Sequence, residues 1–127
     1  MFPTLLAVAL GGGVGSVVRW WLGLRMNAIN PYLPLGTLTV NLAGGLIIGL
    51  LIAFFARMPS LDPMWKALLV TGFCGGLTTF STFSAEVVNM LYTGRYGWGL
   101  TIAATHLFGT LLMTYVAFAL VDWVMPR

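Results

Sequence analysis

The segment from Gly72 to Glu86, G-F-C-G-G-L-T-T-F-S-T-F-S-A-E, carries side chains that could bind a small ion. Phe80 and Phe83 are three residues apart and project in neighbouring directions, while Ser81 and Ser84 repeat that spacing on an adjacent face. An aromatic ring is electropositive at its edge. Ring edges beside hydroxyl and amide donors would therefore suit a small anion, without a full positive charge that would trap it. The alternative is that both rings are ordinary core packing.

Polar side chains recur in three other apolar segments. Asn41 lies one turn after Thr37, so an amide and a hydroxyl share a face; the amide either binds a ligand or joins two helices. Arg19 either anchors a helix end at the membrane interface or has a functional role. Three polar residues recur every four positions and form one stripe, namely His106, Thr110 and Thr114. This stripe indicates a hydrated track, although hydroxyls also bond back to their own helix and His106 alone could be buried packing.

The composition identifies the environment in which these groups must work. Of 127 residues, 59% are hydrophobic and only 7% are charged, and the mean hydropathy is +0.95. Ordinary soluble domains carry about 25% charged residues, so the chain is predicted to be an integral membrane protein. The formal charge of +3 does not suggest nucleic-acid binding. The single cysteine, Cys74, excludes an internal disulfide and a cysteine metal cluster, and we expect a small buried side chain there.

Four apolar stretches are long enough to cross a bilayer, which requires about 20 helical residues. We expect an all-α protein with one four-helix transmembrane domain covering residues 1–127 and spans at about 4–24, 36–56, 64–92 and 97–124. Asp62 before Pro63 predicts a capped start for the third span, and Gly94 predicts its end. Met1, Phe2 and Pro3 carry no basic side chain, so a secretory signal peptide is not expected at this start.

The glycine pair in the third span predicts a break near the middle of the membrane. Gly75 and Gly76, followed by Leu77, Thr78 and Thr79, make a poor helix interior. We therefore expect a second half-helix from about Thr79. Broken helices are tolerated at this depth only where the loose backbone faces protein or a cavity. The freed carbonyls could coordinate a cation, and the start of the second half-helix is electropositive.

Charge and small residues both point to self-association. One side of a four-span chain would carry three basic residues, Arg57, Lys66 and Arg127, and the other Arg25 and Arg95 with Arg19 nearby. Lysine and arginine normally accumulate on the cytoplasmic side. Such a small bias fits a chain that inserts in both orientations, although charge counting is a weak predictor for a short protein. The spacings Gly45-x-x-x-Gly49 and Gly72-x-x-x-Gly76 allow close helix association, and simple packing is their ordinary role.

Three segments together resemble the Fluc (CrcB) family of fluoride channels, and the resemblance covers essentially the whole chain. They are G-G-G-V-G-S-V-V-R-W at 11–20, P-L-G-T-L-T-V-N-L-A-G-G at 34–45 and G-F-C-G-G-L-T-T-F-S-T-F-S-A-E at 72–86. The third is the most specific. The resemblance implies an antiparallel, dual-topology homodimer of four-helix subunits with two fluoride pathways at the subunit interface.

The resemblance also implies roles for individual residues. Asn41 would donate to fluoride, and Phe80 and Phe83 would present ring edges to it. The polar route would continue through Ser81, Thr82, Ser84, His106, Thr110 and Thr114, with Glu86 near one end. Backbone carbonyls at Gly75 and Thr78 would hold one central sodium ion shared by both subunits. Arg19 would lie near an aqueous vestibule.

The implied function is passive export of cytoplasmic fluoride across the inner membrane of a bacterium, not an enzymatic reaction. HF enters as a neutral molecule and dissociates inside, and the channel lets the anion leave. One rival is a small-multidrug-type, proton-coupled exporter, which needs a carboxylate in its first span; this first span has none. Another rival is a non-transporting membrane assembly subunit, in which the polar residues could be lost without effect.

Overall fold

The computed structural model describes residues 1–127 and is entirely helical. Four segments are long and apolar enough to cross a membrane, as predicted, and the third of these, Pro63–Tyr92, is interrupted. The elements in chain order are α1 (Phe2–Met26), α2 (Leu35–Arg57), α3 (Pro63–Lys66), the π-helical η1 (Ala67–Cys74), α4 (Gly75–Leu77), α5 (Phe80–Tyr92) and α6 (Tyr96–Val124). The chain is thus a multi-pass membrane protein.

Both ends of the third segment are set by local chemistry that the sequence predicts. The Asp62 carboxylate accepts a hydrogen bond of 2.9 Å from the backbone N–H of Met64, so it caps the helix that begins at Pro63. At the other end Gly94 has a φ of 76°, which favours glycine. The N–H of Arg95 then donates to the carbonyl of Met90 at 2.8 Å and closes the helix.

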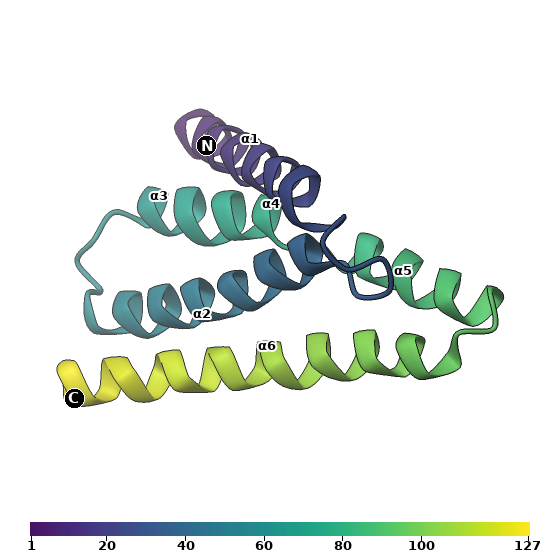
Figure 1. The fold of residues 1–127 in the computed structure, drawn as a ribbon. Coiled ribbons are helices and arrows are strands. Elements are labelled where there is room, and N and C mark those ends of the chain that lie inside the picture. The colour runs from purple at the N-terminus through teal and green to yellow at the C-terminus, as the bar shows by residue number, and fades with distance from the viewer.

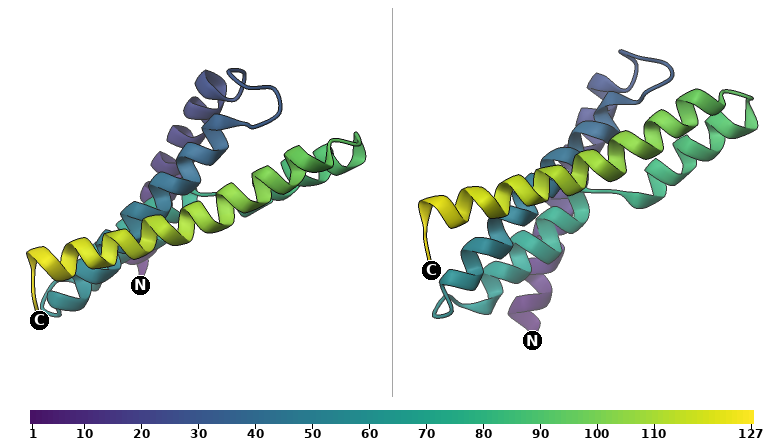
Figure 2. Two further views of the ribbon diagram at one scale, coloured as in Figure 1. Left: turned by 60° about the horizontal axis from the view of Figure 1, so that its bottom comes forward. Right: turned by 90° about the horizontal axis from the view of Figure 1, so that it is seen from below.

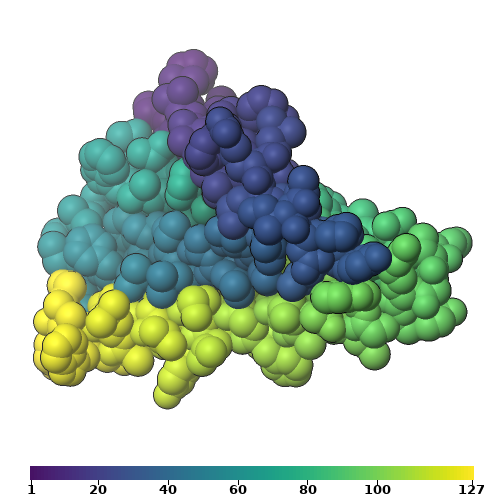
Figure 3. All heavy atoms as spheres, in the orientation of Figure 1, coloured from purple at the N-terminus to yellow at the C-terminus, as the bar shows by residue number.

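The helices associate as two pairs, and the two members of each pair run parallel to each other (Figure 1). α2 and α6 lie side by side with both C-termini at one end, and α1 runs along η1 and α4. α5 packs mainly on the first half of α6. The hairpin that these two helices form points away from the ends of α1 and α2 that are joined by the α1–α2 loop (Figure 2). The α1–α2 loop reaches across to the α5–α6 end (Figure 3), where the ring of Tyr32 stacks on Trp98 with centroids 5.4 Å apart.

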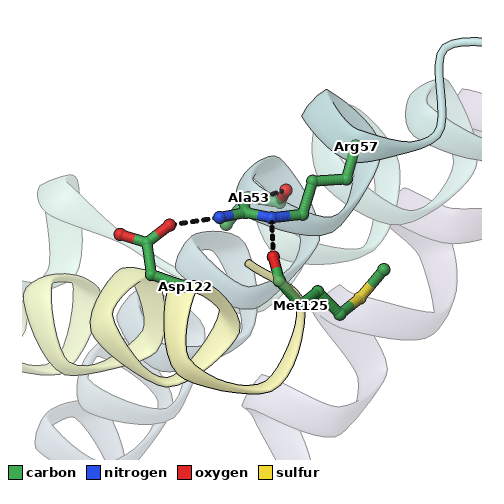
Figure 4. Close-up of polar contacts among 4 residues, drawn as sticks. All are labelled: Ala53, Arg57, Asp122 and Met125. Carbon is green, nitrogen blue, oxygen red and sulfur yellow. Dashed lines mark hydrogen bonds and ion pairs between the residues drawn. The ribbon is translucent and has the colours of Figure 1, made fainter. Parts of the chain in front are cut away.

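A single arginine closes the shared end of α2 and α6 (Figure 4). Parallel helices bring their electronegative C-termini together, so a cation between them is stabilising. Arg57 donates to the carbonyl of Met125 at 2.5 Å and to that of Ala53 at 2.9 Å, and it forms an ion pair with Asp122. The Arg57 side chain is 9% exposed and that of Asp122 60%. The guanidinium therefore caps both helices, whereas the exposed carboxylate adds less.

Glycines bring the backbones of α1 and the third segment into contact. A Cβ on Gly15 would lie 2.3 Å from the carbonyl oxygen of Phe73, and a Cβ on Gly76 would lie 2.3 Å from that of Gly12. Gly45 and Gly49 similarly face the backbone of α6 around Thr114. Packing within the chain, the ordinary role expected for these glycine spacings, is thus confirmed. Close contact of this kind fixes α1 against the interrupted segment.

We expect Gly15→Ala to destabilise the protein by about 1–3 kcal/mol, because the added methyl meets backbone atoms that cannot rotate away. Gly13→Ala is the matched control, since its Cβ would meet nothing within 4 Å. That change should alter stability by less than about 1 kcal/mol, in the stabilising direction. Thermal unfolding of the purified protein in detergent measures both. Equal unfolding temperatures for the two variants would contradict the packing described here.

Candidate functional site

The third segment is interrupted at Thr78 and Thr79, where the backbone is extended. Thr78 has φ −85° and ψ 156°, and Thr79 has φ −149° and ψ 120°. The Thr79 hydroxyl accepts a hydrogen bond of 3.1 Å from the N–H of Thr82, so it caps α5, which begins at Phe80. This agrees with the expected break and with a second half-helix near Thr79. The π-helical turns of η1 before the break were not predicted.

Asn41 of α2 holds the break from one side. Its Nδ2 donates to the carbonyl of Thr79 at 3.0 Å, and its Oδ1 accepts from the N–H of Thr79 at 2.9 Å. The side-chain amide thus satisfies both backbone polar groups of a residue that has left the helix. An unpaired backbone group in lipid costs several kcal/mol, and this pairing removes that cost at Thr79. Asn41 therefore joins two spans, which is the second of the two roles expected for it.

The same amide fixes the hydrogen-bonding state of His106. Nδ2 of Asn41 lies 3.0 Å from Nδ1 of His106. Because an amide nitrogen only donates, Nδ1 must accept, and the ring proton then resides on Nε2. Nε2 is buried and has no hydrogen-bond partner. His106 consequently presents an unused N–H donor in the interior.

The two phenylalanines contact each other and the histidine. The Phe80 and Phe83 rings meet edge to face, with centroids 5.4 Å apart and an interplanar angle of 65°. The Phe83 ring lies 4.7 Å from that of His106. Phe80 is 79% exposed on the single chain, so it is not a core residue. Ordinary core packing accounts for Phe83 more readily than for Phe80.

A groove of about 840 Å³ runs over the break between α2, η1, α4, α5 and α6. It brings together eight residues that the sequence analysis singled out, namely Asn41, Gly75, Thr78, Phe80, Phe83, His106, Thr110 and Thr114. Its wall also includes Cys74 and Thr71, which the sequence does not place there. Neither small side chain stands out by its chemistry, so only the folded arrangement reveals them. The predicted stripe on α6 therefore faces the break.

The hydroxyl of Thr114 is already used within the chain. Its one proton is shared between the carbonyl of Gly45, at 2.9 Å from the hydroxyl oxygen, and that of Thr110, at 3.1 Å. The hydroxyl therefore ties α6 to α2, and its oxygen rather than its proton is left toward the groove. The alternative considered from the sequence, a hydroxyl bonded back to its own helix, applies in part to this residue.

The remaining predicted hydroxyls gather around the start of α5, outside the groove wall. The Thr79 hydroxyl lies 3.3 Å from that of Ser81 and donates to that of Thr82 at 3.2 Å. Ser81 and Ser84 are exposed. They lie on the face of α5 that a single chain leaves uncovered.

Glu86 has a partner that the sequence analysis missed. The hydroxyl of Thr37 donates to its Oε1 at 2.6 Å, while Oε2 is buried without a partner. The signal was present, because Thr37 and Asn41 lie on one face of α2. On that face Thr37 contacts Glu86, and one turn later Asn41 contacts the break. α2 thus contacts both Glu86 and the break.

Arg19 lies against the break itself. Its Nε donates to the carbonyl of Gly76 at 3.0 Å. Thr78 turns its own N–H and hydroxyl back onto the carbonyl of Cys74, at 3.0 and 2.9 Å. None of these bonds ends on the carbonyl oxygens of Gly75 or Thr78. Neutral main-chain oxygens of this kind suit a hard cation such as sodium, so the residues fit the ion that the resemblance implies.

Comparison with known proteins agrees with this arrangement. A model of the family described as "CrcB-like protein, Camphor Resistance (CrcB)" matches residues 6–118. The chain is 58% identical over 124 residues to "Fluoride-specific ion channel FluC" of Serratia proteamaculans (strain 568), which covers 98% of each protein. The protein of the same description from Cronobacter sakazakii (strain ATCC BAA-894) is 61% identical over 118 residues, 93% of each.

The similarity also extends to a more distant bacterium without any loss of coverage. "Fluoride-specific ion channel FluC" of Pseudomonas paraeruginosa (strain DSM 24068 / PA7) is 51% identical over 127 residues, the full length of both chains. The similarity therefore includes all four apolar segments. The chain belongs to the CrcB-like protein family.

Proposed function

We propose that this protein is a fluoride-selective channel that lets cytoplasmic fluoride leave the cell passively. The observation that carries the proposal is the full-length similarity, at 51–61% identity, to bacterial proteins described as fluoride-specific ion channels. The helical, multi-pass architecture supports it. The proposed site of action is the inner membrane of a bacterial cell, where HF that has entered and dissociated leaves its anion trapped.

The proposed working unit is an antiparallel homodimer with two pores. One chain leaves the groove over the break uncovered and leaves Phe80 79% exposed beside it. α5 packs mainly on α6, so its opposite face has no neighbour within the chain. A second copy related by a two-fold axis in the membrane plane would cover both. The near-balanced basic residues support insertion in both orientations.

The proposed pathway selects fluoride by replacing its water with a few fixed donors. The candidate donors in the groove are the Nε2–H of His106, the edges of Phe80 and Phe83, and the hydroxyl of Thr110. Thr114 would continue the polar wall with its oxygen only, because its proton is already used. Ser81, Thr82 and Ser84 would extend it along α5, with Glu86 near one end and Arg19 near the vestibule. A narrow path with neutral donors suits a small anion, and a larger halide would not fit between them.

A structural sodium ion completes the proposal. The carbonyls of Gly75 and Thr78 would supply two ligands from each subunit, four in the dimer, on the two-fold axis. When bound, the ion would supply a positive charge that neutralises main-chain dipoles from both subunits. No acidic ligand is required, because carbonyl oxygens freed at a helix break coordinate monovalent cations elsewhere.

Fluoride efflux from liposomes tests the function. Purified protein should release fluoride from loaded vesicles, followed by a fluoride-selective electrode, with chloride retained and without a proton gradient. A drug exporter would require a proton gradient, and a non-transporting subunit would release nothing. Either of those results contradicts the proposal.

Phe80→Ile and Phe83→Ile test the ring edges. Each change keeps an apolar side chain but removes the quadrupole, so we expect fluoride efflux to fall at least tenfold, roughly the effect of losing 1.4 kcal/mol of stabilisation. Phe108→Ile is the control, because Phe108 is exposed on α6 away from the groove. Size-exclusion chromatography checks that assembly survives. If packing were the only role, an aliphatic substitution would cost less than about 1.5 kcal/mol and efflux would persist.

Cysteine labelling tests dual topology. Ser60→Cys introduces a thiol in the exposed α2–α3 loop, in a Cys74→Ala background that removes the one native thiol. In a dual-topology population an impermeant maleimide should label about half of the chains from outside intact cells. The rest should react only after permeabilisation. Labelling from one side alone would exclude the antiparallel dimer.

A further inference from the structure

Arg19 lies on the face of α1 that packs against the third segment, and this places it at the break. Gly11, Gly15 and Arg19 follow one another every four residues, so they share one face of the helix. A Cβ on Gly11 would lie 2.2 Å from the carbonyl oxygen of Leu68, and one on Gly15 would be equally crowded. The last member of this row donates its Nε–H to Gly76, 57 residues along the chain. The backbone contact therefore fixes where the guanidinium lies.

The carbonyls at the end of α4 are divided between two sides. The last carbonyls of any helix lack partners within it. That of Gly76 is taken by Arg19 on the α1 side. Gly75 and Thr78 lie in the groove wall, and a Cβ on Gly75 would meet nothing within 4 Å. Arg19 thus satisfies the Gly76 carbonyl, which faces α1, while the carbonyls of Gly75 and Thr78 stay free.

We propose that Arg19 is a positioning residue for the cation site: by holding the Gly76 carbonyl it fixes the end of α4, which lies between the carbonyls of Gly75 and Thr78. This inference rests on the sodium part of the proposed function. Its physical basis is that α4 is only three residues long and contains two adjacent glycines, whose backbone deforms easily. The bond from Arg19 holds this short helix at the point where the backbone becomes extended.

Positioning and simple electrostatics predict opposite effects on cation affinity. As a nearby positive charge, Arg19 repels a cation, so its removal in Arg19→Gln would strengthen sodium binding if charge were its only role. As a positioning residue it favours binding, so its removal weakens it. Arg19→Lys keeps the charge but loses the planar guanidinium and its Nε donor. The lysine variant therefore isolates geometry from charge.

The first measurement is sodium-dependent thermal stability in detergent, with N-methylglucamine replacing sodium to keep the ionic strength constant. A ligand that binds the folded state raises stability with its concentration. We expect both Arg19 variants to need at least about tenfold more sodium than the parent, as is common when a group that orients metal ligands is lost. Arg25→Lys is the control, because Arg25 lies on the same helix, is exposed and has its guanidinium over the Trp21 ring.

The second measurement is hydrogen exchange of the backbone amides from Gly75 to Thr78, the turn whose Gly76 carbonyl Arg19 holds, and it does not depend on sodium. Faster exchange in both Arg19 variants, with Arg25→Lys unchanged, supports the positioning role. Unchanged exchange in Arg19→Lys, or stronger sodium binding in Arg19→Gln, overturns it. If the parent itself shows no response to sodium, the sodium part of the proposed function fails, and the exchange rates alone decide the role of Arg19.

Discussion

The structure depends on one constraint, that backbone polar groups in apolar surroundings must find hydrogen-bond partners. Three of the four spans meet it by remaining helical. The third does not, because Thr78 and Thr79 leave the helix. Asn41 pairs with both backbone groups of Thr79, and Arg19 pairs with the carbonyl of Gly76. Two neighbouring spans thus supply the partners that the interrupted span has lost.

These partners are useful only if the neighbouring spans cannot shift. α1 is fixed to the third segment by backbone contact at Gly11 and Gly15, where a larger side chain has no room. α2 is fixed to α6 along its length, and Arg57 closes the end where both helices terminate. Each group that stabilises the break therefore comes from a helix that is itself held by close packing. The break is a rigid feature rather than a loose one.

The sequence predicts those features whose cause is local. The cap at Asp62, the glycine stop at Gly94 and the break that follows the Gly75–Gly76 pair, at Thr78 and Thr79, all depend on neighbouring residues. The partners of polar side chains do not, since Asn41 meets Thr79 from 38 positions away and Thr37 meets Glu86 from 49. A lone asparagine in an apolar helix is therefore equally consistent with a ligand site and with a link between helices. The π-helical turns of η1 likewise could not be predicted. No local motif in the sequence marks them, and in the fold they pack against α1.

The polar groups that stay unpaired divide by chemistry. Because Asn41 donates to Nδ1 of His106, that ring keeps its proton on Nε2 and offers a donor, which suits an anion. The carbonyls of Gly75 and Thr78 offer only acceptors, which suit a cation. Both kinds of group belong to the wall of one groove. A single amide that pairs with Thr79 and with His106 therefore fixes, at once, the backbone next to the Thr78 carbonyl and the ring nitrogen that keeps the proton of His106.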